Sequence, residues 1–357
     1  PSPPAAWPAP PPVTAAAFLA VDAGSGQVLA AGSADQRRPV ASTVKMLTAL
    51  TAVRRSALDD VVTAGDEIAR VPSGAGVGLD PGDTWSVEDL LEGAVARSGN
   101  DAALVLAAHV GGSVDRFVAL MREDAGALGL SGLELHNPHG VDDENRLSAR
   151  DLAVLTRAAL QVPALADIAA RPVVDLPGLG EIPSRNELLG TFEGADGVKT
   201  GFTTASGRCL IATATRDGRQ LLAVVLGSRG ERDHFRDVAA LLDFGFASFA
   251  AQPSAGWDAA VRVPGAWLEP QAALAEILVP TEGDRVAFAF TPPIEPAGVS
   301  TIEASWDDGP LGEVPLTWTG RPAGEAERIG SWLAGRAYAA MRAATVAGAW
   351  AAAEEDV

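Results

Sequence analysis

Lysine is almost absent from this chain of 357 residues. Of its 27 basic residues only Lys45 and Lys199 are lysines, and the remaining 25 are arginines. A guanidinium group stays protonated at any pH that a protein survives, so arginine cannot act as a proton acceptor. The two lysines are therefore candidates for positions whose chemistry needs a primary amine.

Cysteine and net positive charge are also lacking. The single cysteine, Cys209, has no partner for an intramolecular disulfide, so cysteine usage does not identify a cellular compartment. The formal net charge is −19, with a pI near 4.6. Phosphate contacts need clustered lysine and arginine, so this acidic composition argues against a nucleic-acid partner.

The sequence also lacks a recognisable metal-binding pattern. The four histidines have no helical metal spacing and no cysteine companions, which argues against zinc. The acidic run Asp142-Asp143-Glu144 lacks the alternating ligand positions of a calcium loop. We therefore expect neither a metal nor a cofactor. The histidines are His109, His136, His139 and His234.

Three short motifs follow one another along the chain. They are Ser42-Thr43-Val44-Lys45, Ser98-Gly99-Asn100 and Lys199-Thr200-Gly201. Each is weak alone, but their order matches the S-x-x-K, S-x-N and K-T-G motifs of penicillin-binding proteins and serine β-lactamases. Both lysines of the chain lie inside these motifs.

The flanking sequence narrows this resemblance to the D-alanyl-D-alanine carboxypeptidases, the low-molecular-mass penicillin-binding proteins. The similar segments are 39–41, 77–82, 137–141, 148–152 and 196–203, and the similarity runs from about Phe18 to about Phe246. The resemblance implies an α+β fold of the penicillin-binding-protein and β-lactamase type, in which helices pack on an antiparallel sheet. It also implies removal of the terminal D-alanine from peptidoglycan stem peptides, with β-lactam antibiotics as covalent inhibitors.

The catalytic roles follow from residue chemistry and from the resemblance. Ser42 precedes a helical apolar pattern, which places its hydroxyl at the positive end of a helix dipole as the expected nucleophile. Lys45 is one turn further on and would serve as a neutral general base, its pKa lowered by Lys199 as a second cation. Ser98 would pass the proton to the leaving amine, and Asn100 would hold Lys45 and the substrate amide.

Substrate binding is expected along the third motif. Thr200 and Gly201 would lie on an edge strand against which the substrate backbone pairs. The backbone N–H groups of Ser42 and Phe202 would form the oxyanion hole, the latter by carry-over from the family. His234 stands where many family members have an arginine that binds the substrate carboxylate, and we place it in the substrate site. Arg232 and Arg236 are alternatives for that charge.

The predicted elements support a catalytic domain with strands at both ends and helices between them. Short alternating segments separated by proline and glycine follow it and predict a small β-sandwich. We expect strands at 16–23, 27–31, 208–216 and 219–227, and helices at 42–55, 86–97, 100–110, 114–127, 148–160 and 237–246. The expected divisions are a proline-rich tether at 1–12, a catalytic domain at 13–250, a β-rich domain at 251–325, and a C-terminal helix with an acidic tail at 326–357.

Three functional interpretations remain open from the sequence. The first is an exported D,D-carboxypeptidase acting through a Ser42 acyl-enzyme in the cell envelope, although the chain shows no signal peptide. The second is a serine β-lactamase, and the third is a non-catalytic wall-binding or regulatory relative. The resemblance implies association of the C-terminal helix with a membrane surface, because family members often end in a membrane anchor. Arg336, Arg342 and the acidic end of the chain favour instead a helix packed on protein or a truncated native tail.

Overall fold

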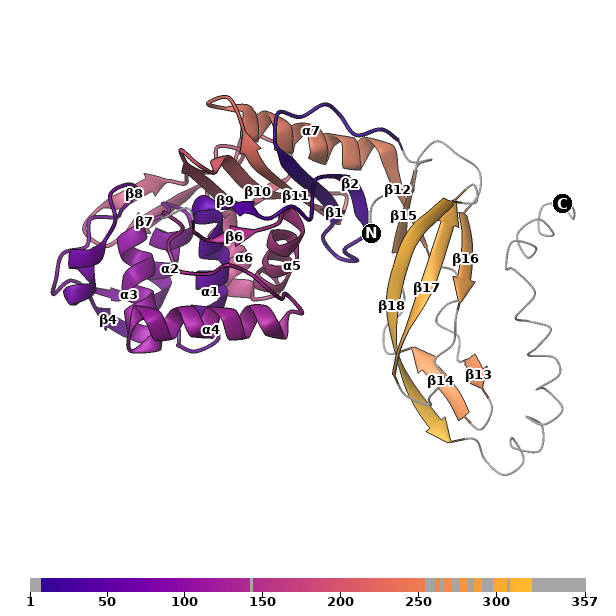
Figure 1. Ribbon diagram of the computed structural model, residues 1–357, viewed down its shortest axis with the longest axis horizontal. Helices are drawn as coiled ribbons and strands as arrows, with labels where there is room; N and C mark the ends of the chain where they lie inside the picture. The colour runs from indigo at the N-terminus through magenta and orange to yellow at the C-terminus, as the bar shows by residue number, and fades with distance from the viewer. Residues whose placement is uncertain are drawn as a thin grey trace, which may run out of the picture. The chain divides into compact units, whose positions relative to one another are not determined.

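The computed structural model describes residues 8–141 and 144–253 and the strands of the C-terminal region (Figure 1). The chain divides into two compact units, of which the first spans Pro10–Phe246. The second contains the strands from residue 249 onwards. The three sequence motifs all belong to the first unit.

Five antiparallel strands form the central sheet of the first unit, in the order β2-β1-β11-β10-β9. β1, near the start of the chain, pairs with β11, so segments about 200 residues apart close the sheet. β9 lies at the edge and pairs with β10 alone. The bounds are Ala17–Asp22 for β1, Val28–Gly32 for β2, Ala195–Thr203 for β9, Gly207–Arg216 for β10 and Arg219–Ser228 for β11.

The hairpin between β10 and β11 turns at Asp217-Gly218, where the sequence predicts it. Asp217 has a φ of 50° and Gly218 a φ of 78°, so both residues are left-handed, as a two-residue hairpin turn requires. Six consecutive residues are buried in each strand. Because successive side chains of a strand point to opposite faces, both faces of the sheet must be covered.

Helices cover the sheet on its two faces (Figure 1). On one face lies α7, Asp233–Ser248, which packs so closely that a Cβ at Gly245 would lie 2.6 Å from the Leu221 side chain. On the other face α5 packs against β1 and β11, and α6 packs against β9. The helices of this layer are α1 (Lys45–Val53), α2 (Val87–Val95), α3 (Asn100–Gly111), α4 (Val114–Ala127), α5 (Ala149–Leu160) and α6 (Pro163–Ala170). The expected α+β class is confirmed.

Local sequence explains where several of these helices begin. Ser86 and Asp89 form a capping box at the start of α2, and Ser148 and Asp151 form another at the start of α5. In each case the serine oxygen and the aspartate carboxylate accept hydrogen bonds from backbone N–H groups that the first turn leaves unpaired. α6 begins at Pro163, at a position where the missing N–H of proline costs nothing.

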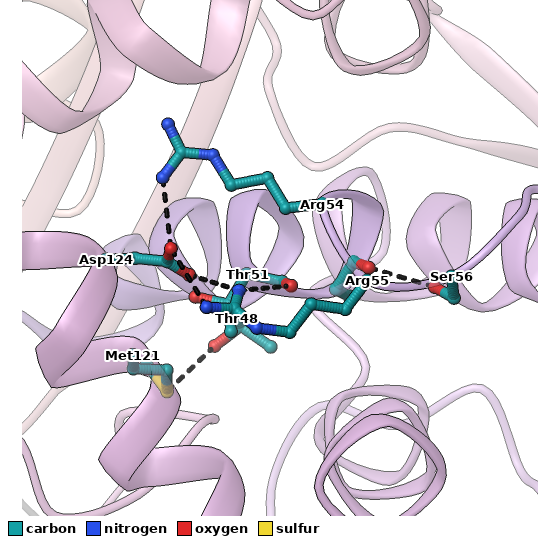
Figure 2. A network of polar contacts seen from close by, with 8 residues as sticks. Thr48, Thr51, Arg54, Arg55, Ser56, Met121 and Asp124 are labelled. Atoms are coloured by element: carbon teal, nitrogen blue, oxygen red, sulfur yellow. Dashed lines mark hydrogen bonds and ion pairs between the residues drawn. The ribbon is translucent and has the colours of Figure 1, made fainter. Parts of the chain in front are cut away.

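A polar cluster joins the end of α1 to α4 (Figure 2). Arg54 and Arg55 both donate to the Asp124 carboxylate, at 3.1 Å and 2.5 Å, and the Thr48 hydroxyl donates to the Pro138 carbonyl at 2.7 Å. Burial alone would raise the Asp124 pKa, but the hydrogen bonds from the two arginines outweigh it and the net shift is downward. The charges of this cluster therefore stabilise one another.

Short elements complete the first unit. A 3-10 turn η1, Ala41–Val44, precedes α1, and another, η2, covers Asp66–Arg70. The two-stranded pairs are β3 (Arg38–Pro39) with β6 (Arg146–Leu147), β4 (Val61–Thr63) with β5 (Thr84–Ser86), and β7 (Val173–Leu176) with β8 (Gly180–Pro183). The sequence reading did not identify α6 or the β7–β8 hairpin, and it began α7 four residues too late.

The second unit is built from strands in its described residues. Five strands pair in the order β13-β14-β18-β17-β16, and β12 pairs with β15. The sequence predicted strand segments at 259–263, 274–279, 285–291, 299–306 and 313–319, so β12 and β14 were not expected. The packing of a sandwich and its boundary at 250 stay predictions. The bounds are Phe249–Pro253 for β12, Val261–Val263 for β13, Ala266–Pro270 for β14, Glu276–Pro280 for β15, Val286–Phe290 for β16, Gly298–Trp306 for β17 and Gly309–Pro322 for β18.

Two expectations fall on other parts of the chain. The predicted C-terminal helix at 326–357 and the start of the proline-rich tether, residues 1–7, lie outside the described residues. Among the described residues no single helix has the length and apolar composition to cross a membrane, although two bent helix pairs meet those criteria jointly.

Candidate active site

Ser42 lies in the 3-10 turn η1, directly before α1. The edge strand β9 approaches this turn so closely that a Cβ at Gly201 would lie 3.0 Å from the Ser42 nitrogen. Gly140 approaches from the other direction, and a Cβ there would lie 2.0 Å from the carbonyl oxygen of Ala41. Glycine at these two positions lets two backbone segments close around the serine.

Lys45 is fully buried and its amine contacts three oxygen atoms. The Nζ atom lies 2.8 Å from Ser42 Oγ, 2.8 Å from Asn100 Oδ1 and 2.7 Å from the backbone carbonyl of His139. The Ser42 hydroxyl also donates to the His139 carbonyl, at 3.3 Å. The serine and the amine that the sequence pairs are thus in direct contact.

The surroundings of Lys45 favour its neutral form. Burial lowers its pKa well below the ordinary value, and the charge of Lys199 lowers it further, while Asp101 acts in the opposite direction. The three oxygens around the amine are uncharged. A buried amine without a carboxylate partner at hydrogen-bond distance has little to stabilise its proton, which suits a general base.

The second motif reaches the site at the start of α3. Ser98 is 4% exposed and has a φ of 64°, and Asn100 is the first residue of α3 and is 1% exposed. Asn100 binds Lys45 through its side chain and the Ala75 carbonyl through its backbone N–H, at 2.9 Å. The structure brings Asn100 to Lys45 as expected. Within the described part of the chain, the Ser98 hydroxyl makes no hydrogen bond to either lysine.

Lys199 lies on β9 and is also buried, at 1% exposure. Its Nζ atom donates to the Thr200 carbonyl at 2.8 Å. Burial and the charge of Arg185 lower its pKa to about 7. At neutral pH this amine therefore exists in both protonation states, and in its charged form it lowers the pKa of Lys45.

The rest of the third motif forms the accessible edge of the site. Thr200 is half-buried, Gly201 faces the serine turn, and Phe202 is 57% exposed. The Arg208 guanidinium stacks over the Phe202 ring, 4.6 Å from its centroid. The sequence did not assign Arg208 to the site.

His234 does not present a charged group. It is 4% exposed on α7, and burial followed by the charge of Arg208 lowers its pKa to about 4, so the ring is neutral at physiological pH. Its Nδ1 atom is buried without a hydrogen-bond partner among the described residues. The two alternatives are already paired, Arg232 with Glu187 and Arg236 with Asp233.

Several positioning residues escaped the sequence reading. The Asp101 carboxylate accepts hydrogen bonds from the backbone N–H groups of Val77, Gly78 and Leu79, and so holds a loop beside Asn100. Arg185 supplies a cation that acts on both lysines. Asp101 directly follows the second motif, which was a usable signal. Arg185 had none, because nothing in its local sequence links it to the lysines.

The loop that contains His139 contributes a backbone atom. The Asn137 side chain accepts from the Gly140 N–H at 2.7 Å, and Asn145 Nδ2 donates to the Asn137 carbonyl at 2.9 Å. These bonds shape the loop so that the His139 carbonyl meets Lys45. Burial, followed by the charge of Lys45, lowers the pKa of the His139 imidazole to about 4. Segment 137–141 is among those similar to the family, and what it contributes to the site is a main-chain oxygen.

Within the described residues, no cluster of three or more histidine, cysteine, aspartate or glutamate side chains is arranged to hold a metal ion. What the site contains is a hydroxyl beside a buried amine of lowered pKa, with a second amine nearby. Such an arrangement can generate an oxygen nucleophile and can transfer an acyl group to it.

Comparison with known proteins agrees with this chemistry. Residues 5–230 match the family described as D-alanyl-D-alanine carboxypeptidase. The chain is 36% identical to DacC of Escherichia coli over 252 residues, which are 67% of this chain and 63% of DacC. It is also 36% identical to DacB2 of Mycobacterium tuberculosis over 239 residues, which are 64% of this chain and 81% of DacB2. Both relatives are named D-alanyl-D-alanine carboxypeptidases.

Solved structures show the same fold. Penicillin-binding protein 5 from Haemophilus influenzae aligns with a TM-score of 0.77 and 27% identity, over 89% of this chain and all of that one. A D-alanyl-D-alanine carboxypeptidase from Mycobacterium tuberculosis aligns with a TM-score of 0.65 and 34% identity, over 69% of this chain and 96% of that one. The fold expected from the motifs is therefore confirmed.

Proposed function

Because the chain belongs to the D-alanyl-D-alanine carboxypeptidase family, we propose that it is a serine D,D-carboxypeptidase that removes the terminal D-alanine from peptidoglycan stem peptides. The observation that carries this proposal is the 2.8 Å contact between Ser42 Oγ and the buried amine of Lys45. A hydroxyl becomes a useful nucleophile only when a base of suitable pKa lies within hydrogen-bond reach.

Acylation begins with transfer of the Ser42 proton to the neutral Lys45 amine. Ser42 Oγ then attacks the carbonyl carbon of the penultimate D-alanine, and the N–H groups of Ser42 and Phe202 stabilise the oxyanion. The Ser98 hydroxyl passes the proton to the departing amine, and D-alanine leaves. Water then hydrolyses the ester on Ser42, and Lys45 serves again as the base.

Asn100 and the His139 carbonyl keep the Lys45 amine beside the serine through their contacts at 2.8 Å and 2.7 Å. Burial, followed by the charge of Lys199, keeps the pKa of Lys45 low. The substrate backbone pairs with the free edge of β9 along Thr200, Gly201 and Phe202, as an added strand. His234 belongs to the same end of the site, where the substrate terminates.

β-Lactam antibiotics react with the same serine, because opening the strained ring needs only the nucleophile, the base and the oxyanion hole. The serine β-lactamase interpretation is less well supported. DacC, DacB2 and the two solved structures described above are named as carboxypeptidases or as a penicillin-binding protein.

Cell-wall peptides lie outside the cytoplasm, so this function places the enzyme in the cell envelope. Association with a membrane surface through residues 326–357 is a separate part of the proposal, supported by the apolar groups of that segment and opposed by its charges. Flotation of the full chain and of a chain ending before residue 326 with anionic vesicles tests it.

Labelling with a reporter penicillin tests the function. The full chain should form a stable adduct that peptide mapping places on Ser42, and it should release D-alanine from a pentapeptide ending in D-Ala-D-Ala. The Ser42→Ala variant should do neither and should keep the thermal unfolding midpoint of the wild type. A label on another residue, or D-alanine release by Ser42→Ala, would exclude the acyl-enzyme mechanism.

A further inference from the structure

A carboxypeptidase substrate ends in a free carboxylate, and binding such an anion in a partly enclosed site calls for a cation. The charge expected at the far end of β9 is not supplied by His234, whose ring is buried and neutral. Arg232 and Arg236 are engaged with Glu187 and Asp233. These contacts direct attention to a cation on another element, closer to β9.

Arg208 lies on β10, directly opposite Phe202 on β9. Adjacent strands are roughly 5 Å apart, so the backbone of Arg208 is one strand spacing from the edge strand along which the peptide is bound. Its guanidinium stacks over the exposed Phe202 ring at 4.6 Å. Phe202 in turn follows Gly201, the residue that packs against the Ser42 turn.

The stacking on Phe202 matters for what Arg208 can bind. A guanidinium on an aromatic face keeps its N–H donors free around the rim of the plane, because the contact uses only its face. The ring also restricts the long side chain to one region, which reduces the entropy lost when a ligand binds. Phe202 is thus a platform that holds a cation at the end of the substrate strand.

Arg208 carries no ion pair within the described part of the chain. Nine arginines of the first unit have a nitrogen atom within 4.0 Å of a carboxylate oxygen, and Arg208 is not one of them. The nine are Arg54, Arg55, Arg116, Arg146, Arg150, Arg171, Arg216, Arg232 and Arg236. Other arginines, such as Arg37 and Arg185, also have no carboxylate partner among the described residues. What distinguishes Arg208 is its position over Phe202, beside the catalytic edge. Its positive field does reach His234, whose pKa it lowers.

We propose that Arg208 binds the C-terminal carboxylate of the substrate and thereby selects peptides with a free terminus. The carboxylate accepts hydrogen bonds from the guanidinium edge, and the Thr200 hydroxyl, two residues from Phe202 on β9, donates to its other oxygen. The neighbouring His234 ring is neutral, so it does not repel the arginine. This assignment rests on the proposed carboxypeptidase function and adds the residue that recognises the substrate end.

The test compares two substrates that differ only at the terminus. A peptide ending in D-Ala-D-Ala and its C-terminal amide are cleaved by the wild type and by Arg208→Ala, with enzyme in excess so that slow cleavage can be followed. Arg208→Ala should lose about 10- to 100-fold in kcat/KM on the free acid, mainly through KM, because a charge-assisted hydrogen bond is lost. On the amide it should change by less than about threefold.

Two further variants separate binding from structure. Arg208→Lys keeps the charge but loses the planar fork and the stacking, so it should recover part of the activity on the free acid. Arg236→Ala removes a guanidinium that is 77% exposed and paired with Asp233, and it should behave as the wild type on both substrates. Thermal unfolding midpoints of all variants show whether the fold is intact.

The outcomes are distinct. Equal losses on the acid and the amide, no loss on either, or the same loss in Arg236→Ala would each overturn the assignment of Arg208. If the wild type releases D-alanine and is labelled at Ser42, such a result contradicts Arg208 alone. If the wild type neither releases D-alanine nor reacts with penicillin, the proposed function fails and the Arg208 assignment fails with it.

Discussion

The two ends of α1 carry polar clusters of opposite design. Just past its C-terminal end, Arg54 and Arg55 share the carboxylate of Asp124, and their positive charges also suit the negative end of the helix dipole (Figure 2). At its first residue, Lys45 is fully buried among uncharged oxygens at the positive end of the dipole. The first cluster pairs opposite charges, whereas the second holds an amine with no carboxylate at hydrogen-bond distance among the described residues.

This difference distinguishes a structural cluster from a reactive one. At Asp124 the net pKa shift stabilises the charged form, so the cluster holds the fold together and resists titration. At Lys45 the shift destabilises the charged form, so the amine is ready to accept a proton at the expense of folding stability. Substitutions at the two ends should therefore separate activity from stability.

The largest effect is expected at Lys45. Arginine cannot accept a proton and methionine has no amine, so Lys45→Arg and Lys45→Met should each reduce D-alanine release and penicillin acylation by about 10²- to 10⁴-fold. The free energy of unfolding of Lys45→Met should equal or exceed that of the wild type, because a buried amine is replaced by an apolar group of similar size. Near-wild-type turnover in Lys45→Met would exclude Lys45 as the base.

A smaller effect, on folding stability and not on activity, is expected at Asp124. Its side chain is 8% exposed, and its arginine partners are 37% and 27% exposed. Asp124→Asn should lower the free energy of unfolding by about 1–2 kcal/mol, since water partly screens the two arginines. Activity per folded molecule should stay within about twofold of the wild type, because the cluster is at the far end of α1.

Glu123→Gln on the same helix is the matched control for Asp124→Asn. Its partner is Arg116, and both side chains are more than half exposed, at 57% and 59%. Urea titrations should show a change of less than about 0.5 kcal/mol for this variant. Equal losses in the two variants would mean that the Asp124 cluster stabilises no more than a surface pair does.

The last effect is a pH dependence of the stability, caused by Lys199. In the folded chain its pKa is about 7, whereas the ordinary value is near 10.5. Between these values the unfolded chain binds one more proton, so the free energy of unfolding rises with pH, by about 1.4 kcal/mol per unit at most. Over about pH 7.5 to about pH 9.5, Lys199→Met should show a slope shallower than the wild type by up to that amount.

Urea unfolding of both proteins at several pH values measures the two slopes. Lys199→Arg is the control, because arginine stays charged in both the folded and the unfolded chain and should also lack the added slope. Parallel curves for the wild type and both variants would show that Lys199 keeps an ordinary pKa and would exclude the lowered value.

Much of the first unit was predictable from the sequence. The serine and lysine of the first motif meet because three residues make about one helical turn, so their contact at 2.8 Å is local. The Asp217-Gly218 turn and the serines that begin α2 and α5 are local signals as well. The start of α7 was misjudged because its first turn is polar and weakly periodic.

The other half of the site depends on contacts between distant segments. Lys45 reaches Asn100 across 55 residues and the His139 carbonyl across 94. Every residue has a main-chain carbonyl oxygen, so a sequence motif cannot identify the one that contacts Lys45. Arg185 and Arg208 are ordinary arginines in sequence, and only the packing of the strand edge gives one an influence on the lysines and the other a place over Phe202.

The sequence by itself determined the chemistry of this protein: a serine, two amines and an asparagine in motifs whose residue types cannot be exchanged. Only the tertiary structure decided how that chemistry is tuned. The pKa of an amine depends on burial and on charges that lie close in space, and both are set when segments far apart in the chain pack together. Lys45 and Lys199 are the same residue type as any surface lysine. Burial lowers the pKa of both, helped by the charge of Arg185 and, for Lys45, by the charge of Lys199.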